Sequence, residues 1–180
     1  MSRYALSHRF AGRKLPKGFT LIEILIVVVI LGILAAIVIP QFSSASNQAR
    51  ESTLKDCLRY LREQIGIYKM QHNDVPPGYP AGNLSASPDA PTFLSQMTQN
   101  TDTAGNVSSS YSDVFHNGPY LSEMPNDPLN NLPGIWVVTG GGMPSPDASQ
   151  PFGWIYNPST QQIIANLPGN DLNGVPYSTY

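Results

Sequence analysis

The chain has a single cysteine and, over most of its length, no basic side chain. Because Cys57 is alone, neither an intramolecular disulfide nor a cysteine-based zinc site can form. No lysine or arginine follows Lys69, whereas eight acidic residues do. Phosphate contacts need cationic side chains, so the part of the chain beyond Lys69 is not expected to bind nucleic acid.

The same part lacks the residue spacings of an enzyme. His72 and His116 are isolated, and neither lies in a metal-ligand spacing. The glycine-rich "TGGGMP" at 139–144 continues into proline, whereas a phosphate-binding loop continues into a helix that carries Lys and Ser or Thr. No spacing indicates a Ser-His-Asp triad or a pair of catalytic carboxylates. We therefore expect no enzymatic activity.

What the chain does have is one long apolar run near its start. The run extends from Phe19 to Ile39 and has 21 residues. As a helix with a rise of about 1.5 Å per residue it would be about 32 Å long, which is enough to cross a bilayer core. The basic residues before it are Arg3, Arg9, Arg13, Lys14 and Lys17. This charge asymmetry predicts a cytoplasmic N-terminus, with residues 41–180 on the far side of the membrane.

Two ordinary interpretations of the run leave Glu23 unexplained. A secretory signal peptide would have a shorter apolar region and a cut site, for which "FSSAS" at 42–46 is a candidate. A plain membrane anchor would fit the length of the run. Neither accounts for a carboxylate near the start of the run, which costs about 2.5–3.5 kcal/mol at membrane depth.

The helical pattern continues beyond the apolar run. Apolar residues recur at spacings of three and four, at Leu54, Cys57, Leu58, Leu61, Ile65 and Tyr68. The opposite face is charged, and Glu51 and Lys55 form an i,i+4 pair on it. The pattern predicts one helix from about 19 to 71, bent or loosened at Pro40. The "HNDVPPGYP" stretch at 72–80 ends it.

The remainder predicts short elements in a loop-rich head. Residues 80–112 are mostly loop, with a short helix at 90–98 capped by Asp89. Segments 134–140, 153–157 and 161–167 are rich in β-branched and aromatic residues and predict strands, the last two forming a hairpin. The expected fold class is α+β: a long helix packed on a small antiparallel sheet, in the shape of a ladle.

The stretch "KGFTLIEILIVVVILGILAAIVIPQF" closely resembles the N-terminus of type IV pilins and type II secretion pseudopilins. The resemblance implies a leader, residues 1–18, that prepilin peptidase cuts between Gly18 and Phe19. It also implies N-methylation of Phe19 and assembly roles for Glu23 and Pro40. The expected parts are then the leader, a membrane and filament-core helix at 19–40, an amphipathic helix half at 41–72 and a head at 73–180.

Cleavage would give Glu23 a partner. Cutting after Gly18 exposes an amine on Phe19, and methylation keeps its positive charge. The uncut leader has an amide nitrogen there and offers no cation. Phe19 lies four residues, about 6 Å of helical rise, before Glu23. A neighbouring copy shifted along a filament axis is therefore expected to bring its Phe19 amine to this carboxylate.

Two further segments bear on the choice of family member. "GPYLSEMPNDPLNN" at 118–131 resembles a segment of the major pseudopilin, although Leu129 and Asn130 replace the usual aromatic residue and glycine. Major pseudopilins hold calcium in a C-terminal loop. Asp171 and Asn173 in "GNDLNGVP" are candidate oxygen ligands, but this loop does not match that of the family, and a plain Asx turn is the alternative.

The sequence therefore predicts a structural subunit that is processed by prepilin peptidase and polymerises through its N-terminal helix, most simply a type II secretion pseudopilin. Expected partners are other copies, pilin-like subunits, an inner-membrane assembly platform and a motor ATPase. Before assembly it would be a single-pass inner-membrane protein with a periplasmic head. One alternative is a type IV pilin of a surface pilus for adhesion, motility or DNA uptake. The other is a membrane-anchored periplasmic binding module.

Overall fold

The computed structural model describes residues 18–180, so most of the predicted leader, with Lys17, lies outside the described residues. The chain divides into two compact units, one ending at Ser44 and the other spanning Ala45–Tyr180. All buried hydrophobic residues of the core belong to the second unit. This unit therefore has the core that an independently folding domain needs.

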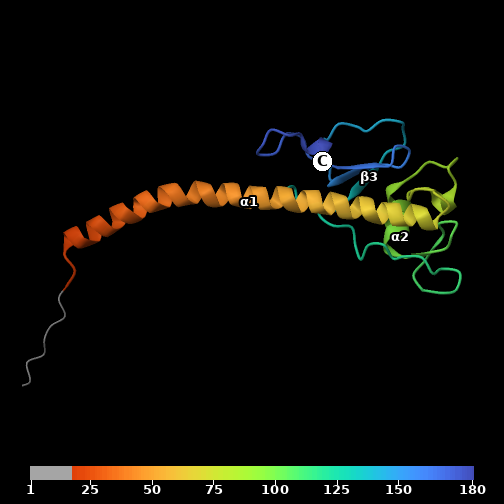
Figure 1. The fold of residues 1–180 in the computed structure, drawn as a ribbon, viewed down its shortest axis with the longest axis horizontal. Coiled ribbons are helices and arrows are strands. Elements are labelled where there is room, and N and C mark those ends of the chain that lie inside the picture. The colour runs from red at the N-terminus through yellow and green to blue at the C-terminus, as the bar shows by residue number, and fades with distance from the viewer. Residues whose placement is uncertain (1–17) are drawn as a thin grey trace, which may run out of the picture. The chain divides into compact units, whose positions relative to one another are not determined.

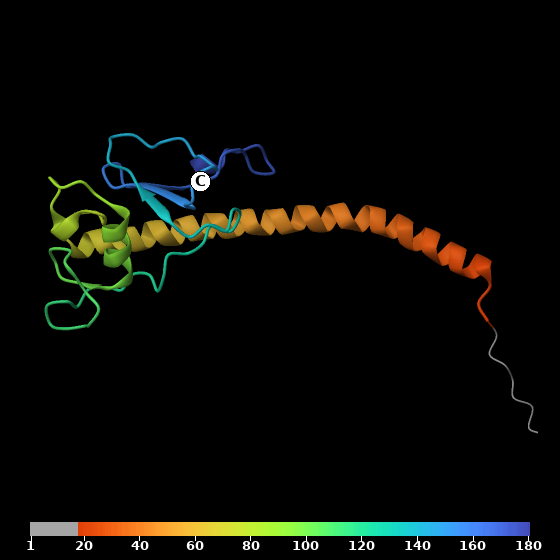
Figure 2. The ribbon, with the colours of Figure 1, turned by 180° about the vertical axis from the view of Figure 1, so that it is seen from behind.

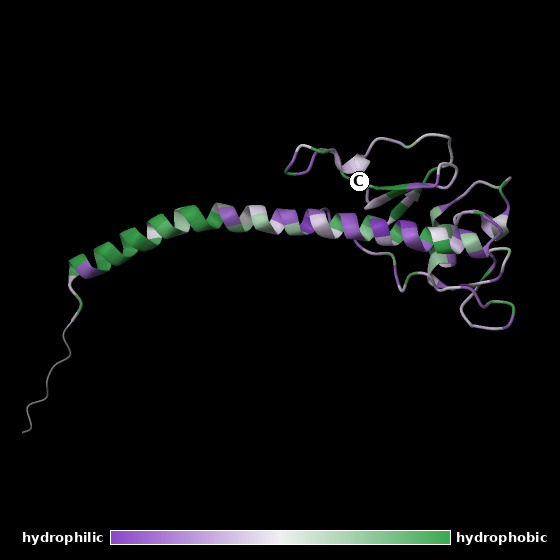
Figure 3. Cartoon of the chain, viewed as in Figure 1, coloured by the Kyte–Doolittle hydropathy of each residue, from purple (hydrophilic) through white to green (hydrophobic). Residues whose placement is uncertain are grey.

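Helix α1 (Leu21–Gln71) is the single long helix that the sequence predicts. Apart from Glu23 in its first turn, its first part is apolar, whereas polar and apolar residues are interspersed in its second part (Figure 3). The helix runs through Pro40 without a break in its assignment. Proline has no N–H to donate, so the carbonyl four residues earlier loses its usual helical partner there.

The part of α1 beyond Ala45 buries the predicted stripe. Leu54, Leu58 and Leu61 are fully buried, and Ile65 and Tyr68 nearly so. Cys57 is half-buried at the margin of this stripe, where desolvation raises the pKa of its thiol. The apolar period of three and four residues is thus confirmed as the face on which the head packs.

Short elements follow α1 and lie along its C-terminal part (Figures 1 and 2). Helix α2 (Ala90–Thr98) is confirmed, with the Asp89 carboxylate accepting from Thr92 N–H at 2.7 Å as an N-cap. The predicted loop at 80–112 contains more structure than expected. It holds a 3₁₀ turn, η1 (Pro80–Gly82), and two strands that form an antiparallel ribbon, β1 (Asn100–Thr101) and β2 (Val107–Ser108).

The main sheet has the order β3 (Ile135–Val137), β4 (Trp154–Asn157), β5 (Gln162–Ala165). The predicted hairpin of β4 and β5 is present and antiparallel. Strand β3 instead pairs with β4 in parallel, so the α+β class holds but the sheet is mixed. The physical reason is the long connection at 138–153, because parallel neighbours need a crossover of about a dozen residues or more.

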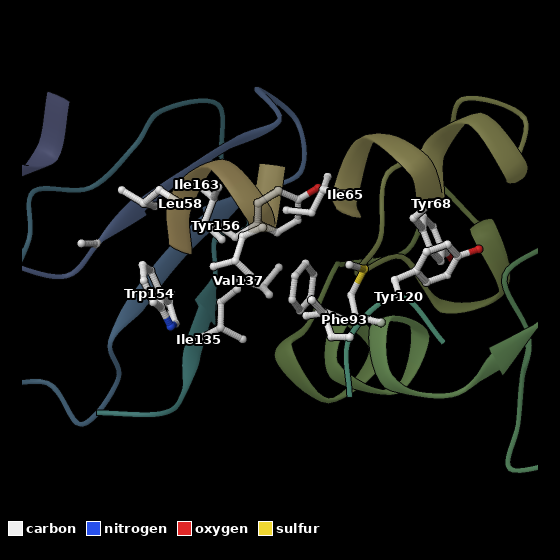
Figure 4. Close-up of a cluster of buried hydrophobic side chains, with 14 of the residues drawn as sticks. Leu58, Ile65, Tyr68, Phe93, Tyr120, Ile135, Val137, Trp154, Tyr156 and Ile163 are labelled. Atoms are coloured by element: carbon white, nitrogen blue, oxygen red, sulfur yellow. The ribbon is translucent and has the colours of Figure 1, made fainter. Parts of the chain in front are cut away.

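The two faces of this sheet are covered differently. The inner face carries Ile135, Val137, Trp154, Tyr156 and Ile163, which pack with the leucines of α1 (Figure 4). The outer face carries Ile155 and Ile164, which lie under Met143 and Phe152 of the connection between β3 and β4. A last 3₁₀ turn, η2 (Tyr177–Thr179), contacts β5.

The "GPYL…NDPL" segment joins α2 to the sheet. The N–H groups of Tyr120 and Leu121 both donate to the Met97 carbonyl, at 2.9 and 2.8 Å. The buried Asp127 carboxylate accepts from Leu129 N–H at 2.7 Å, and desolvation raises the pKa of this group. The indole of Trp154 donates to the Pro125 carbonyl at 2.7 Å. The segment is thus a strap held at both ends.

Candidate functional site

The start of α1 is the first candidate site, because its large apolar side chains are exposed. The exposed fractions of the large apolar residues between positions 21 and 39 run from 42% at Val38 to 84% at Leu21. Within residues 18–180, α1 is the one helix long and apolar enough to cross a membrane, and none of its apolar window is buried. Such a surface needs lipid or other proteins to cover it.

Glu23 closes the N-terminus of this helix. Its Oε2 accepts from both the N–H and the hydroxyl of Thr20, at 2.7 and 2.8 Å. The Glu23 N–H donates in return to the Thr20 hydroxyl at 3.2 Å. This is a capping box, which satisfies two backbone donors that the helix cannot satisfy itself. The sequence carries its signal, Thr-x-x-Glu before an apolar run, but our sequence interpretation did not use it.

The capping box leaves part of the carboxylate available. Among the described residues, no hydrogen bond is made to Oε1 of Glu23. One oxygen can therefore stabilise the helix end while the other accepts a cation. The pairing of Glu23 with a Phe19 amine involves a second, cleaved copy and stays a prediction.

The predicted cleavage site lies just before the helix. Gly18, Phe19 and Thr20 precede α1 and are exposed, with Phe19 83% exposed. Apart from its two chain neighbours, a Cβ added to Gly18 would meet no atom of the described residues within 4 Å. The Gly18–Phe19 bond is thus in an accessible, non-helical segment, as an endopeptidase substrate must be.

The second candidate is the C-terminal loop with Asp171 and Asn173. The Asp171 Oδ1 accepts from the N–H groups of Asn173 and Val175, both at 2.8 Å. Its Oδ2 accepts from the Tyr180 hydroxyl at 2.5 Å, and the Lys55 ammonium lies 3.8 Å away. The Tyr180 bond and the backbone donors hold the pKa of Asp171 below its usual range. The loop is an Asx turn stabilised by protein groups.

This donor arrangement does not fit a calcium site as it stands. Calcium takes six to eight oxygen ligands, whereas N–H, O–H and ammonium groups already face the one carboxylate. Among residues 18–180, no group of three or more His, Cys, Asp and Glu side chains is arranged to hold a metal. Calcium at Asp171 and Asn173 stays a prediction drawn from the resemblance.

A thermal melt tests the calcium prediction. Because protein groups hold the loop, EDTA should shift the melting temperature of the 45–180 fragment by less than about 1 °C, as expected when no bound ligand is removed. Differential scanning fluorimetry with and without millimolar calcium measures this. A clear rise with calcium that Asp171→Asn removes would establish the site.

Glu51 holds the same C-terminal segment from the side of α1. It is 5% exposed, and its Oε1 accepts from Leu172 N–H and from the Tyr177 hydroxyl, both at 3.0 Å. The predicted ion pair between Glu51 and Lys55 is wrong, because Lys55 turns to Asp171 and to the Tyr180 ring, 4.2 Å from its centroid. We call Glu51, Lys55, Asp171, Tyr177 and Tyr180 the C-terminal clamp.

Arg62 extends this contact along α1. Its guanidinium donates to the backbone oxygen of Ile163 at 2.9 Å and to that of Tyr180. Since Ile163 belongs to β5, Arg62 joins α1, the sheet and the C-terminal segment. In the sequence, Arg62 falls on the charged face of the helical pattern, and nothing in that pattern distinguishes it from the other charged residues there.

The two histidines are structural or exposed. His72 is buried at the end of α1, with Nδ1 2.6 Å from the Tyr68 carbonyl and Nε2 2.9 Å from the Thr101 hydroxyl. Burial lowers the pKa of its imidazole. His116 is exposed, and its Nδ1 contacts the Asp113 carbonyl. Both rings contact backbone carbonyls, and the buried His72 links the end of α1 to Thr101.

The comparisons with known proteins agree with the geometry at the start of α1. Residues 13–39 match the family model described as a prokaryotic N-terminal methylation motif. The type II secretion system core protein G of Pseudomonas aeruginosa is 44% identical over 64 residues, which are 36% of this chain and 45% of that relative. The match thus spans less than half of that protein.

Two other relatives match over longer stretches. The type II secretion system core protein G of Aeromonas hydrophila is 29% identical over 119 residues, 66% of this chain and 71% of the relative. The type IV narrow pilus major component of Thermus thermophilus is 32% identical over 100 residues, 55% of this chain and 84% of the relative. No solved structure gave a significant match.

Proposed function

This chain belongs to the superfamily of type IV pilins and type II secretion pseudopilins, and we propose that it is a structural subunit of a type IV pilus-like filament, specifically a pseudopilin of a type II secretion system. The family assignment rests on the methylation motif and on relatives that match over most of their length. The filament and its role in secretion are the proposal.

The exposed apolar part of α1 is the observation that carries this function. The large apolar side chains of the helix from Leu21 to Ile39 are exposed, so this surface has to be covered by lipid before assembly and by other copies afterwards. A helix that is apolar on all sides suits both environments. An anchored binding module would need its apolar helix to be covered by lipid only, and not by other copies.

Processing supplies the second half of the mechanism. Prepilin peptidase would cut between Gly18 and Phe19, and the new Phe19 amine would pair with Glu23 of the neighbouring copy. Removing residues 1–18 leaves five basic residues against twelve acidic ones, a formal charge of −7. An assembly platform and a motor ATPase in the inner membrane would move the subunit from lipid into a periplasmic filament.

The cleavage is testable by mass spectrometry. Expressed in cells that carry prepilin peptidase, the protein should lose residues 1–18 and begin with a methylated Phe19. A Gly18→Arg variant should stay at full length, because an arginine side chain stands at the cut. Recovery of an intact N-terminus from the unmodified protein in those cells would favour the anchored binding module.

A surface pilin is the second candidate, favoured by the Thermus thermophilus pilus component, of which the match covers 84%. The "GPYL…NDPL" strap, which resembles the major pseudopilin, supports the secretion role instead. Immunogold electron microscopy separates the two. Filaments on intact cells at native expression would indicate a surface pilus, whereas label confined to the periplasm would indicate a pseudopilus.

A further inference from the structure

An aromatic groove lies on the outer face of the main sheet, opposite α1. Trp136 of β3 pairs in register with Ile155, and this row of side chains faces away from the leucines of α1. The connection between β3 and β4 covers Ile155 completely but leaves Trp136 40% exposed. The result is a groove of about 390 Å³ lined by Trp136, Phe152, Pro144, Ser145, Asp147 and Gln150.

The floor of the groove is a single aromatic platform. The rings of Trp136 and Phe152 contact each other with centroids 5.5 Å apart and planes at 47°. Phe152 also packs on the buried outer-face cluster, which fixes its position. An exposed indole on a rigid base presents an apolar face together with a polar edge, as ligand-binding tryptophans do.

The polar wall of the groove is held in place by a buried side chain. Asn166 is 1% exposed, and its Oδ1 accepts from Asp147 N–H at 2.7 Å. Its Nδ2 donates to the carbonyls of Asp147 and Phe152, at 2.9 and 3.0 Å. Three hydrogen bonds thus fix the turn at 147–152 before any ligand arrives. Such preorganisation lowers the entropic cost of binding.

The polar wall offers a carboxylate as hydrogen-bond acceptor and no cationic side chain. The Asp147 carboxylate accepts from Ser149 N–H at 2.9 Å and from the Gln150 amide nitrogen at 3.3 Å. The side-chain carbonyl oxygen of Gln150 is a further acceptor in this wall. The Ser149 donors hold the pKa of Asp147 below its usual range. No lysine or arginine is among these lining residues. Phosphates and other anions are therefore poor ligands here.

These features select the ligand chemistry. Proline-rich peptides also bind aromatic grooves, but a run of prolines has no hydrogen-bond donor to offer the Asp147 carboxylate. A pyranose brings hydroxyl donors for the wall and a flat C–H face for the indole. We propose that the groove binds neutral sugar residues of a polysaccharide, with Trp136 as the platform and Asp147 and Gln150 as hydroxyl acceptors.

Assembly into a filament would raise the overall affinity for a polymeric ligand. This step rests on the proposed function: in a filament assembled through α1, the face of the head that carries α1 turns toward other copies, and the opposite face stays accessible. Each subunit would then present one groove, and many weak sites would act together on a polymeric ligand. The binding by a single head does not depend on assembly.

The test uses the soluble 45–180 fragment, which has its own core, so failure to assemble cannot mask the result. Isothermal titration calorimetry would be run with neutral hexasaccharides of glucose, N-acetylglucosamine and galactose. We expect saturable binding of at least one of them, weakened about tenfold or more by Trp136→Ala and less by Trp136→Phe. Because Trp154 is fully buried, a change in tryptophan fluorescence on binding would report Trp136.

A matched control and the opposing outcomes make the test decisive. Tyr111→Ala removes another exposed aromatic side chain, 71% exposed and outside the groove, and should leave binding unchanged. Circular dichroism melts confirm that the variants fold. Failure of all three hexasaccharides to bind overturns the proposal, as does binding that Trp136→Ala leaves intact. Salt-sensitive binding of a lysine-rich peptide alone would identify a cation site instead.

Discussion

Glu23→Gln is expected to abolish filament assembly while leaving membrane insertion and leader cleavage in place. The glutamine keeps an oxygen that can accept from Thr20 and maintain the capping box, but it removes the charge that a neighbouring Phe19 amine requires. Removing one partner of a buried ion pair costs about 3–5 kcal/mol, which corresponds to a loss of roughly a hundredfold or more in subunit association. Filaments in shear fractions and on electron-microscope grids measure this loss.

A Thr20 variant separates the two roles of the carboxylate. Thr20→Val removes the side-chain half of the capping box, worth about 1 kcal/mol, and keeps the charge of Glu23. It should therefore assemble far better than Glu23→Gln. Equal defects in the two variants would show that the helix cap matters and the ion pair does not. Wild-type assembly of Glu23→Gln would disprove the pairing.

Glu51→Ala is expected to lower the free energy of unfolding of the head by about 2–4 kcal/mol. The variant leaves the Leu172 N–H and the Tyr177 hydroxyl without their acceptor, and hydrogen bonds to a carboxylate contribute about 1.5–3 kcal/mol each. The expected loss is below their sum because Leu172 is 57% exposed, so water can replace part of the lost bonding. Urea denaturation of the 45–180 fragment, followed by circular dichroism, measures the change.

Glu51→Gln is the matched control, because its amide oxygen can still accept both bonds. It should lose about 1 kcal/mol, since a neutral acceptor is weaker than a charged one. Limited proteolysis adds a local readout: the 169–180 segment should be cut first in Glu51→Ala. Equal stability of Glu51→Ala and the unmodified fragment would mean that the C-terminal clamp does not fasten this segment.

The helices were predictable because their signals are local. The period of three and four residues from Leu54 to Tyr68 identifies the buried stripe, and Asp89 identifies the start of α2. The β4–β5 hairpin follows from two apolar runs around a short turn. The parallel pairing of β3 was not predictable, since the long connection between β3 and β4 permits either direction.

The residues of the candidate sites also fall into those that a local pattern predicts and those that depend on distant contacts. Gly18, Phe19 and Glu23 stand in a contiguous motif, so the sequence alone is enough to predict them as site residues. The partners of Glu51 are 121 and 126 residues away in the chain, and helical periodicity assigns Glu51 to the solvated face. The polar wall beside Trp136 likewise depends on Asn166, which is 19 residues beyond Asp147.

The sequence alone determined the membrane-length apolar helix, the processing motif and the family, because each is written in adjacent residues with a fixed period or spacing. Only the tertiary structure decided how the head is held together and what its surface offers. It showed that Asp171 serves an Asx turn within a clamp of protein side chains, and that Trp136 lies in a groove. Those outcomes depend on contacts between distant segments, and the free energy of such contacts is set by burial and geometry that no local pattern records.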